Sequence, residues 1–118
     1  MKKIIQTKDA PAPIGAYNQA VLSGNTLYIS GQIAINPVSG ELEQKTIEEE
    51  TEQVMRNLKA ILGAAEMNFE NVVKSSIFIS DMNNFGRINA VYSKYFDEAT
   101  APARETVEVA NLPKFVNV

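Results

Sequence analysis

The segment TIEEETEQVMRNLKAILGAA, residues 46–65, decides the fold class of this chain, because it carries a clear helical periodicity. Its apolar residues recur at intervals of three and four and predict a long amphipathic helix with one buried stripe. The stripe consists of Ile47, Val54, Leu58, Ile61, Leu62 and Ala65.

The start of this helix has its own signature. Thr46, followed three residues later by Glu49, forms a capping box, so we expect the helix to begin there. Glu48, Glu49, Glu50 and Glu52 crowd the first turns, where the helix dipole favours anions. We interpret this acidic run as a solvated face of the helix.

Segments on both sides of the helix have the patterns of β-strands. Residues 2–6 are a short candidate, and residues 17–22 and 26–35 predict a hairpin closed by the turn Ser23-Gly24-Asn25. Residues 72–80 are rich in β-branched and aromatic side chains and predict a buried strand.

A second helix and further strands follow in the C-terminal third. Asp81 is the predicted cap of a helix whose apolar positions are Phe85, Ile88, Tyr92, Tyr95 and Phe96. A strand begins near Arg104, and residues 115–118 resemble the opening of another. This order predicts a single α+β domain spanning residues 1–118, with a mixed sheet and two helices packed on one face. The uncovered face of so small a sheet favours self-association.

Composition narrows the possible functions. The 118 residues carry a net charge of −3, so nucleic acid is not an expected partner. No apolar stretch approaches the ~20 residues that span a bilayer, and no signal peptide is visible, so we expect no membrane association and a cytoplasmic location. The chain lacks His and Cys, and no P-loop, dinucleotide fingerprint or metal-ligand spacing appears. We therefore expect chemistry without a metal or cofactor.

Arg104 is the candidate functional residue with the most distinctive chemistry. It follows Ala101-Pro102-Ala103 at the start of an alternating segment, and its guanidinium matches a carboxylate in bidentate fashion. A surface ion pair is the alternative interpretation. Asn89, in the apolar stripe of the second helix, either braces a loop or faces a ligand. Gly31, within the second hairpin strand, marks a bulge or a close backbone approach, and Tyr17 either is an ordinary half-buried tyrosine or lends its phenol to a pocket.

Five segments together closely resemble the reactive-intermediate deaminase family, the RidA or YjgF-type group of 2-iminobutanoate/2-iminopropanoate deaminases. The resemblance covers essentially the whole chain in order and spacing. It rests on Ile14-Gly15-Ala16-Tyr17, Ile29-Ser30-Gly31-Gln32, Asn36-Pro37, residues 78–92 and Ala101-Pro102-Ala103-Arg104, of which the last is the most specific motif.

The resemblance implies a chorismate-mutase-like α+β fold, assembled as a homotrimer with ligand clefts between neighbouring subunits. It implies that Arg104 holds the substrate carboxylate and that Tyr17, Ser30, Gly31 and Asn89 line the same cleft. The implied activity is hydrolysis of short 2-imino acids and their enamine tautomers to 2-oxo acids and ammonia. The alternative is a trimer that binds or senses a small 2-oxo acid without useful turnover. Ribonuclease activity is a third interpretation, disfavoured by the absence of His.

Two positions depart from the family pattern. Thr106 stands where many family members have a cysteine, so no thiol is needed, and its backbone N–H is expected to contact the ligand. Family members also continue beyond the position of Val118 into a last strand, which bears a glutamate implicated in positioning or activating water. We therefore expect the C-terminal strand of this sequence to be incomplete, which corresponds either to a shortened form or to a different way of activating water.

Overall fold

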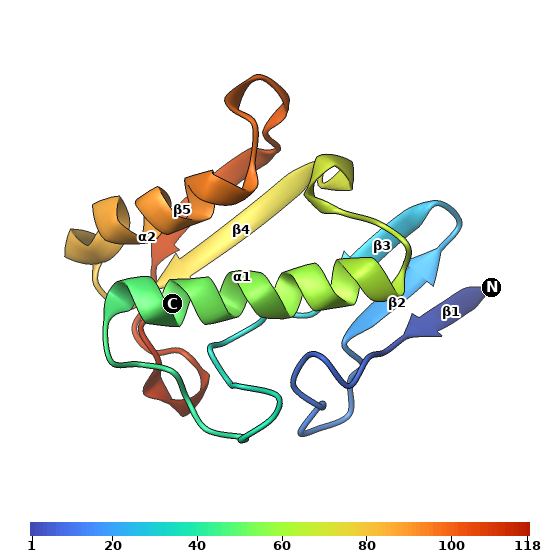
Figure 1. Cartoon of the computed structure of the whole chain (residues 1–118), viewed down its shortest axis with the longest axis horizontal. Coiled ribbons are helices and arrows are strands. Elements are labelled where there is room, and N and C mark those ends of the chain that lie inside the picture. Colours follow the sequence, from blue (N-terminus) through green and yellow to red (C-terminus); the bar gives the residue numbers. More distant parts are fainter.

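Five strands lie in one layer of the molecule and are hydrogen-bonded as two sheets. The computed structural model describes residues 1–118, and Figure 1 shows its ribbon. The antiparallel sheet has the order β1-β2-β3 and consists of β1 (Lys2–Ile5), β2 (Ala20–Ser23) and β3 (Thr26–Ile29). The parallel sheet pairs β4 (Lys74–Ile79) with β5 (Ala103–Glu108).

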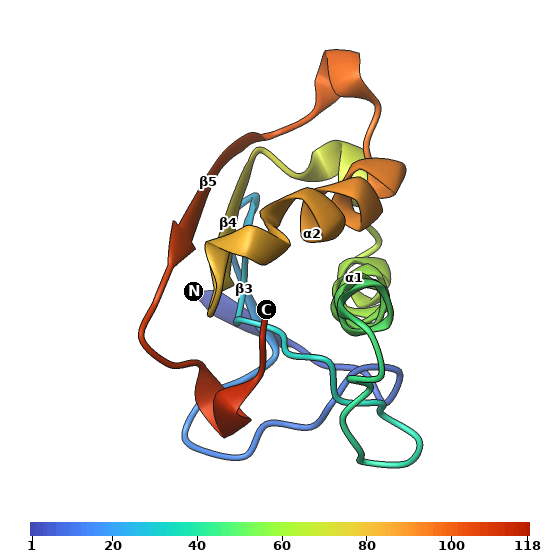
Figure 2. The same ribbon diagram turned by 90° about the vertical axis from the view of Figure 1, so that its left-hand side faces the viewer.

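Both helices lie on the same side of the strand layer. Figure 2 shows α1 (Ile47–Ala64) and α2 (Phe85–Tyr92) facing the strands from one side. The predicted α+β architecture, with two helices on one face, is therefore confirmed. The strands do not form one continuous mixed sheet, because no ladder of hydrogen bonds joins β3 to β4. None of the helices is both long enough and apolar enough to span a bilayer.

The hairpin of β2 and β3 forms as predicted, although both strands are shorter than expected. Gly24 is the first residue of the two-residue turn and has φ +58°, a left-handed backbone conformation that glycine adopts readily. β3 ends at Ile29, and Ser30 makes a last backbone bond from its N–H to the Gln19 carbonyl, 2.9 Å. The chain then leaves the sheet at Gly31, the position whose glycine interrupts the apolar run.

The expected strand at residues 115–118 is not formed. Lys114 and Phe115 have φ values of +55° and +54°, which no strand accommodates, and they belong to a short 3₁₀ turn. The segment is nevertheless fixed, because the Ser80 N–H donates to the Asn117 carbonyl over 3.1 Å. Val116 and Val118 are buried beneath the helices.

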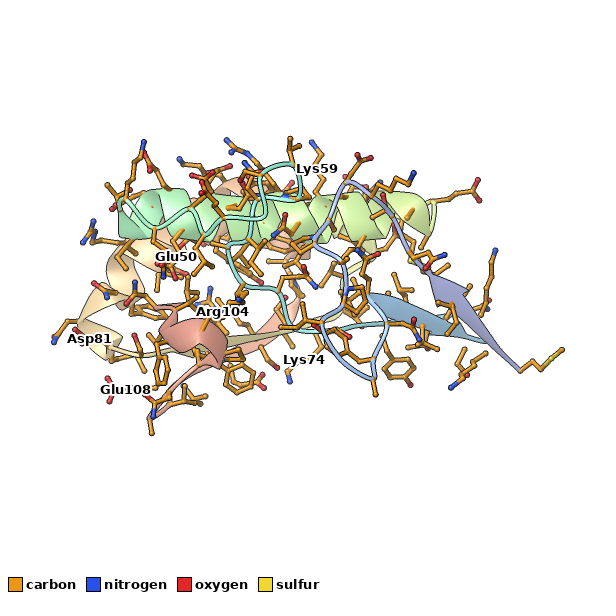
Figure 3. The ribbon with its side chains drawn as sticks, turned by 90° about the horizontal axis from the view of Figure 1, so that it is seen from below. Glu50, Lys59, Lys74, Asp81, Arg104 and Glu108 are labelled. Atoms are coloured by element: carbon orange, nitrogen blue, oxygen red, sulfur yellow. The ribbon has the colours of Figure 1, made fainter.

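The start of α1 confirms one prediction and corrects another. The Thr46 hydroxyl accepts from the Glu49 N–H at 3.0 Å, as a helix cap should. Glu50, however, is fully buried on the side of α1 that faces the strand layer, instead of being solvated (Figure 3). Its carboxylate accepts from the Asn117 backbone N–H at 2.7 Å, the Asn117 side-chain amide at 2.8 Å and the Val118 N–H at 3.1 Å. These bonds satisfy a charge that burial would otherwise penalise.

A buried amide on α1 fixes the loop that follows β3. The Asn57 side chain donates to the carbonyls of Ile33 and Ile35 at 3.1 and 3.0 Å, and its oxygen accepts from Gln53 at 2.8 Å. Asn57 is fully buried, so these bonds are protected from water. They hold in place the segment that begins with Ser30 and Gly31.

Candidate functional site

Arg104 lies on the side of β5 that faces α2. Its register partner on β4 is Ser75, whose hydroxyl accepts from the Tyr92 hydroxyl of α2 at 3.0 Å. The Arg104 guanidinium carbon is 5.0 Å from the centroid of the Tyr92 ring and 5.6 Å from that of Phe85. At these distances the aromatic faces attract the cation and restrict where it can lie.

The guanidinium is also held by a side-chain hydrogen bond. Arg104 Nη1 donates to Asn89 Oδ1 over 2.6 Å, and Asn89 lies on α2 one turn after Phe85. Arg104 takes part in no salt bridge, since the two ion pairs of the chain are Lys74–Glu105 and Arg87–Glu48. Its Nε and Nη2 have no partner in the structure. Together these two nitrogens offer two parallel N–H donors, which is the geometry that binds both oxygens of a carboxylate.

A pocket of about 690 Å³ opens beside this guanidinium. One wall is aromatic and leads into a cluster of tilted and edge-on rings, in which the Phe96 ring centroid lies 4.7 Å from that of Tyr92 and 5.2 Å from that of Phe69. Polar groups from α2 and from the loop before β5 complete the lining. The lining residues are Asn89, Tyr92, Ser93, Phe96, Glu98, Ala101, Pro102 and Arg104. The pocket therefore combines an aromatic wall with several polar and charged groups, which suits it to orienting a small polar ligand.

The structure brings together two of the residues predicted from the sequence and leaves the others apart within one chain. Arg104 and Asn89 share the pocket, whereas Tyr17, Ser30 and Gly31 do not line it. The Tyr17 hydroxyl accepts from the Ile14 N–H at 3.3 Å, and the Ser30 hydroxyl donates to the Asn18 carbonyl at 2.6 Å. These three residues therefore belong to a separate surface formed by the loops around β2 and β3.

Thr106 lies two residues beyond Arg104 on the same face of β5. It does not line the pocket, and its hydroxyl oxygen is buried without a hydrogen-bond partner. A buried hydroxyl in this state is unusual in native proteins. The unpaired oxygen sits next to the predicted anchor, on the face that the helices cover.

Glu98 and Ser93 were not identified from the sequence. Both line the Arg104 pocket, Ser93 immediately after α2 and Glu98 in the 3₁₀ turn Glu98–Thr100. The sequence indicates only that a turn is present at residues 98–100, because Asp97 is a good capping residue and Pro102 stiffens the approach to β5. Which side chain of that turn faces the pocket depends on its three-dimensional path.

The ionisable groups with shifted pKa values lie outside the pocket. A two-point hydrogen bond from Arg87 lowers the pKa of Glu48 to about 2 and ties α1 to α2. Burial, together with a hydrogen bond to Glu52, raises the pKa of Tyr95 to about 12. Tyr95 packs on Phe69 behind the aromatic wall. These contacts therefore brace elements that carry pocket residues, without lining the pocket themselves.

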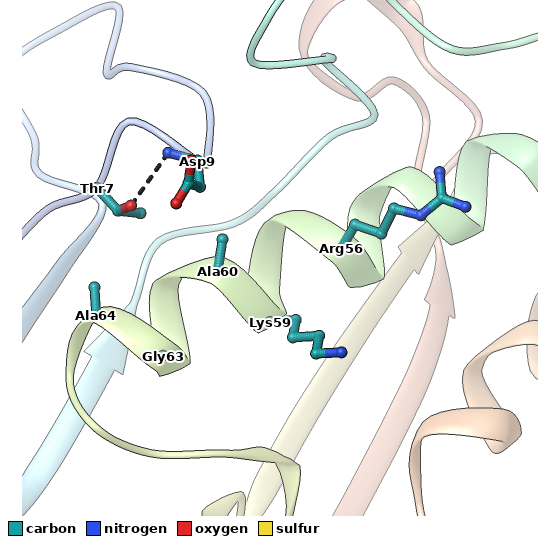
Figure 4. Close-up of a pocket in the computed structure, with 7 residues that line it drawn as sticks. All are labelled: Thr7, Asp9, Arg56, Lys59, Ala60, Gly63 and Ala64. Atoms are coloured by element: carbon teal, nitrogen blue, oxygen red, sulfur yellow. Dashed lines mark hydrogen bonds between the residues drawn. The ribbon is translucent and has the colours of Figure 1, made fainter.

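A second hollow, of about 520 Å³, lies at the C-terminal half of α1 (Figure 4). It is lined by Thr7, Asp9, Arg56, Lys59, Ala60, Gly63 and Ala64. Its basic side chains are exposed and extend along the helix, away from the Thr7–Asp9 loop. No hydrogen bond holds Arg56 or Lys59 as Asn89 holds Arg104. We therefore consider the Arg104 pocket the better candidate site. The structure contains no group of three or more side chains arranged to ligate a metal ion.

Comparisons with known proteins identify the family of this chain. The family described as Endoribonuclease L-PSP matches residues 7–118. A RutC family protein of Synechocystis is 51% identical over 117 residues, covering 98% of this chain and 90% of the relative. The 2-iminobutanoate/2-iminopropanoate deaminase of rat is 47% identical over 114 residues, covering 97% and 82%.

Solved structures agree with the fold. The crystal structure of Escherichia coli TdcF with bound serine superposes with a TM-score of 0.91 at 41% identity, covering 98% of this chain and 91% of that one. Sequence and structure agree over nearly the full length of the chain, so it belongs to the Endoribonuclease L-PSP family, which is the Rid or YjgF-type family that includes 2-iminobutanoate/2-iminopropanoate deaminases.

Proposed function

We propose that this protein hydrolyses short-chain 2-imino acids, the tautomers of enamines such as 2-aminoacrylate and 2-aminocrotonate, to 2-oxo acids and ammonia. The proposal rests above all on Arg104. Its guanidinium is held by Asn89 and two aromatic rings, carries no acidic partner, keeps Nε and Nη2 unpaired, and belongs to a residue that lines a pocket. The rat relative, which is named for this reaction, supports the same choice.

The reaction requires few catalytic groups from the protein. With its carboxylate held by Arg104, the protonated imine places its electrophilic carbon in the pocket. Water adds to that carbon, and a proton moves from the added oxygen to the nitrogen. The C–N bond then breaks as the C=O bond forms, and the remaining oxygen proton leaves with ammonia as ammonium. An iminium carbon already reacts with water, so holding the reactants in position supplies much of the required rate enhancement. Such an enzyme would remove reactive enamines released by pyridoxal-phosphate dehydratases, and a cytoplasmic location suits that role.

The proposal includes a homotrimer in which each site is shared between neighbouring subunits. Tyr28, Phe78 and Val107 leave apolar side chains exposed on the face of the strands away from the helices, a surface suited to self-association. A Cβ at Gly31 would meet no atom within 4 Å, so packing within one chain gives no reason for that glycine. In the trimer, Gly31 and its neighbours Ser30 and Tyr17 would approach the Arg104 pocket of an adjacent subunit.

Light scattering tests this assembly. We expect a mass three times the 13.0 kDa of the chain at micromolar concentration. A monomer mass under these conditions would contradict both the trimer and the shared sites.

Ammonia release tests the reaction. Threonine and a pyridoxal-phosphate dehydratase generate 2-aminocrotonate, and ammonia is followed with and without this protein. We expect the protein to accelerate release and Arg104→Lys to remove most of the acceleration. Arg56→Lys is the matched control, because Arg56 is an exposed arginine that does not line the Arg104 pocket. An unchanged rate of release with added protein would refute the enzymatic proposal.

Binding without turnover is the second candidate function, and the TdcF structure favours it. That relative holds serine, an amino acid rather than an imine. The same Arg104 pocket would then act as a metabolite-binding site. Tight binding of 2-oxobutanoate together with no acceleration of ammonia release would select this alternative.

A further inference from the structure

Two opposite charges line the Arg104 pocket without neutralising each other. Glu98, an exposed residue, lines the same pocket as Arg104. The two side chains form no ion pair with one another, and neither pairs with any other residue. The Glu98 carboxylate also accepts no hydrogen bond. A pocket with a free cation and a free anion is complementary to a ligand that carries both charges.

The backbone that carries Glu98 is fixed by its neighbours. The Asp97 carboxylate accepts from the Ala99 N–H at 3.0 Å, and the Asp97 carbonyl accepts from the Thr100 N–H at 3.0 Å. The Asp97 carboxylate is therefore occupied by a hydrogen bond within the turn, whereas the Glu98 carboxylate has no partner and remains available to a ligand. Pro102 then stiffens the short connection from this turn to Arg104.

We propose that Glu98 receives the positively charged nitrogen of the ligand, while Arg104 receives its carboxylate. The inference rests on the proposed function and deepens it, because it names the residue that distinguishes the iminium substrate from the 2-oxo product. A protonated imine carries a cation on the carbon adjacent to its carboxylate, and the product has a neutral oxygen there. Glu98 is thus a specificity-determining residue that favours the charged substrate and releases the product.

Calorimetry with two matched ligands tests this assignment. 2-Aminobutanoate carries an ammonium group at the relevant position, and 2-oxobutanoate carries a carbonyl at the same position. We expect Glu98→Gln to weaken binding of 2-aminobutanoate about tenfold, the effect of losing one charge-assisted hydrogen bond, and to leave 2-oxobutanoate binding within about twofold. Glu41→Gln is the control, because Glu41 is exposed and outside the pocket.

The pattern of results separates this inference from the proposed function. If Glu98→Gln leaves 2-aminobutanoate binding unchanged, or weakens both ligands equally, Glu98 does not recognise the nitrogen. If Arg104→Lys leaves 2-oxobutanoate binding unchanged, the carboxylate anchor itself is wrong. A selective loss of 2-aminobutanoate in Glu98→Gln, reversed in Glu98→Asp, would support the assignment.

Discussion

Replacing Arg104 by lysine should remove most of the affinity for a 2-oxo acid while leaving the fold intact. The arginine is held by a 2.6 Å bond from Nη1 to Asn89, which leaves Nε and Nη2 for the ligand. Lysine keeps the positive charge but lacks the planar fork, and its ammonium would not reproduce the position of the guanidinium over the Tyr92 ring. A charge-assisted hydrogen bond contributes about 1.5–3 kcal/mol, so the loss of one weakens binding roughly ten- to a hundredfold.

Titration of 2-oxobutanoate by calorimetry measures this change, and Arg56→Lys supplies the control. Arg104 is exposed in the single chain, so its loss should change the free energy of unfolding by less than about 1 kcal/mol. Denaturant unfolding of both variants checks that the fold is unaffected. Equal affinity in the Arg104→Lys variant and the parent would refute the role of Arg104 as the carboxylate anchor.

Two further predictions concern stability. Glu50→Leu should lower the free energy of unfolding by about 3 kcal/mol, because the buried N–H groups of Asn117 and Val118 would lose their acceptor; Glu49→Leu, at an exposed position, should change it little, and denaturant titration compares the two. The hydrogen bonds from Arg87 lower the pKa of Glu48 from 4.5 to about 2, so the pair stabilises the fold above pH 4.5 and this contribution is lost as pH falls through 2. Arg87→Gln should therefore make stability less dependent on pH between 4.5 and 2, and an unchanged pH profile would contradict this reasoning.

Local signals were enough to predict most of the architecture. The Thr46 cap, the turn at Gly24 and the apolar stripe of residues 47–65 depend on residues close in sequence, and each produced the expected element. The second helix is shorter than predicted, because Asp81 caps a 3₁₀ turn and α2 ends at Tyr92, before Tyr95 and Phe96. Strand lengths were less predictable, because β3 ends where Gly31 turns the chain away from the sheet.

The sequence is a poor guide to side chains whose environment depends on residues distant in the chain. Glu50 looks like one of several solvated glutamates, but its partners Asn117 and Val118 lie 67 and 68 positions away. The sequence pointed to Arg104 and Asn89, and the structure adds the hydrogen bond between them and the position of the Arg104 guanidinium over the Tyr92 ring. Glu98 carries no motif, and only the path of its turn places it in the pocket.

Direct trapping of the imine tests most sharply whether this protein is an imine hydrolase that acts through Arg104. An amino-acid oxidase converts 2-aminobutanoate to 2-iminobutanoate, and semicarbazide captures the imine that remains. We predict that the protein lowers semicarbazone formation in proportion to its concentration and that Arg104→Lys loses most of this effect. Identical semicarbazone formation with and without the protein would contradict the proposed function.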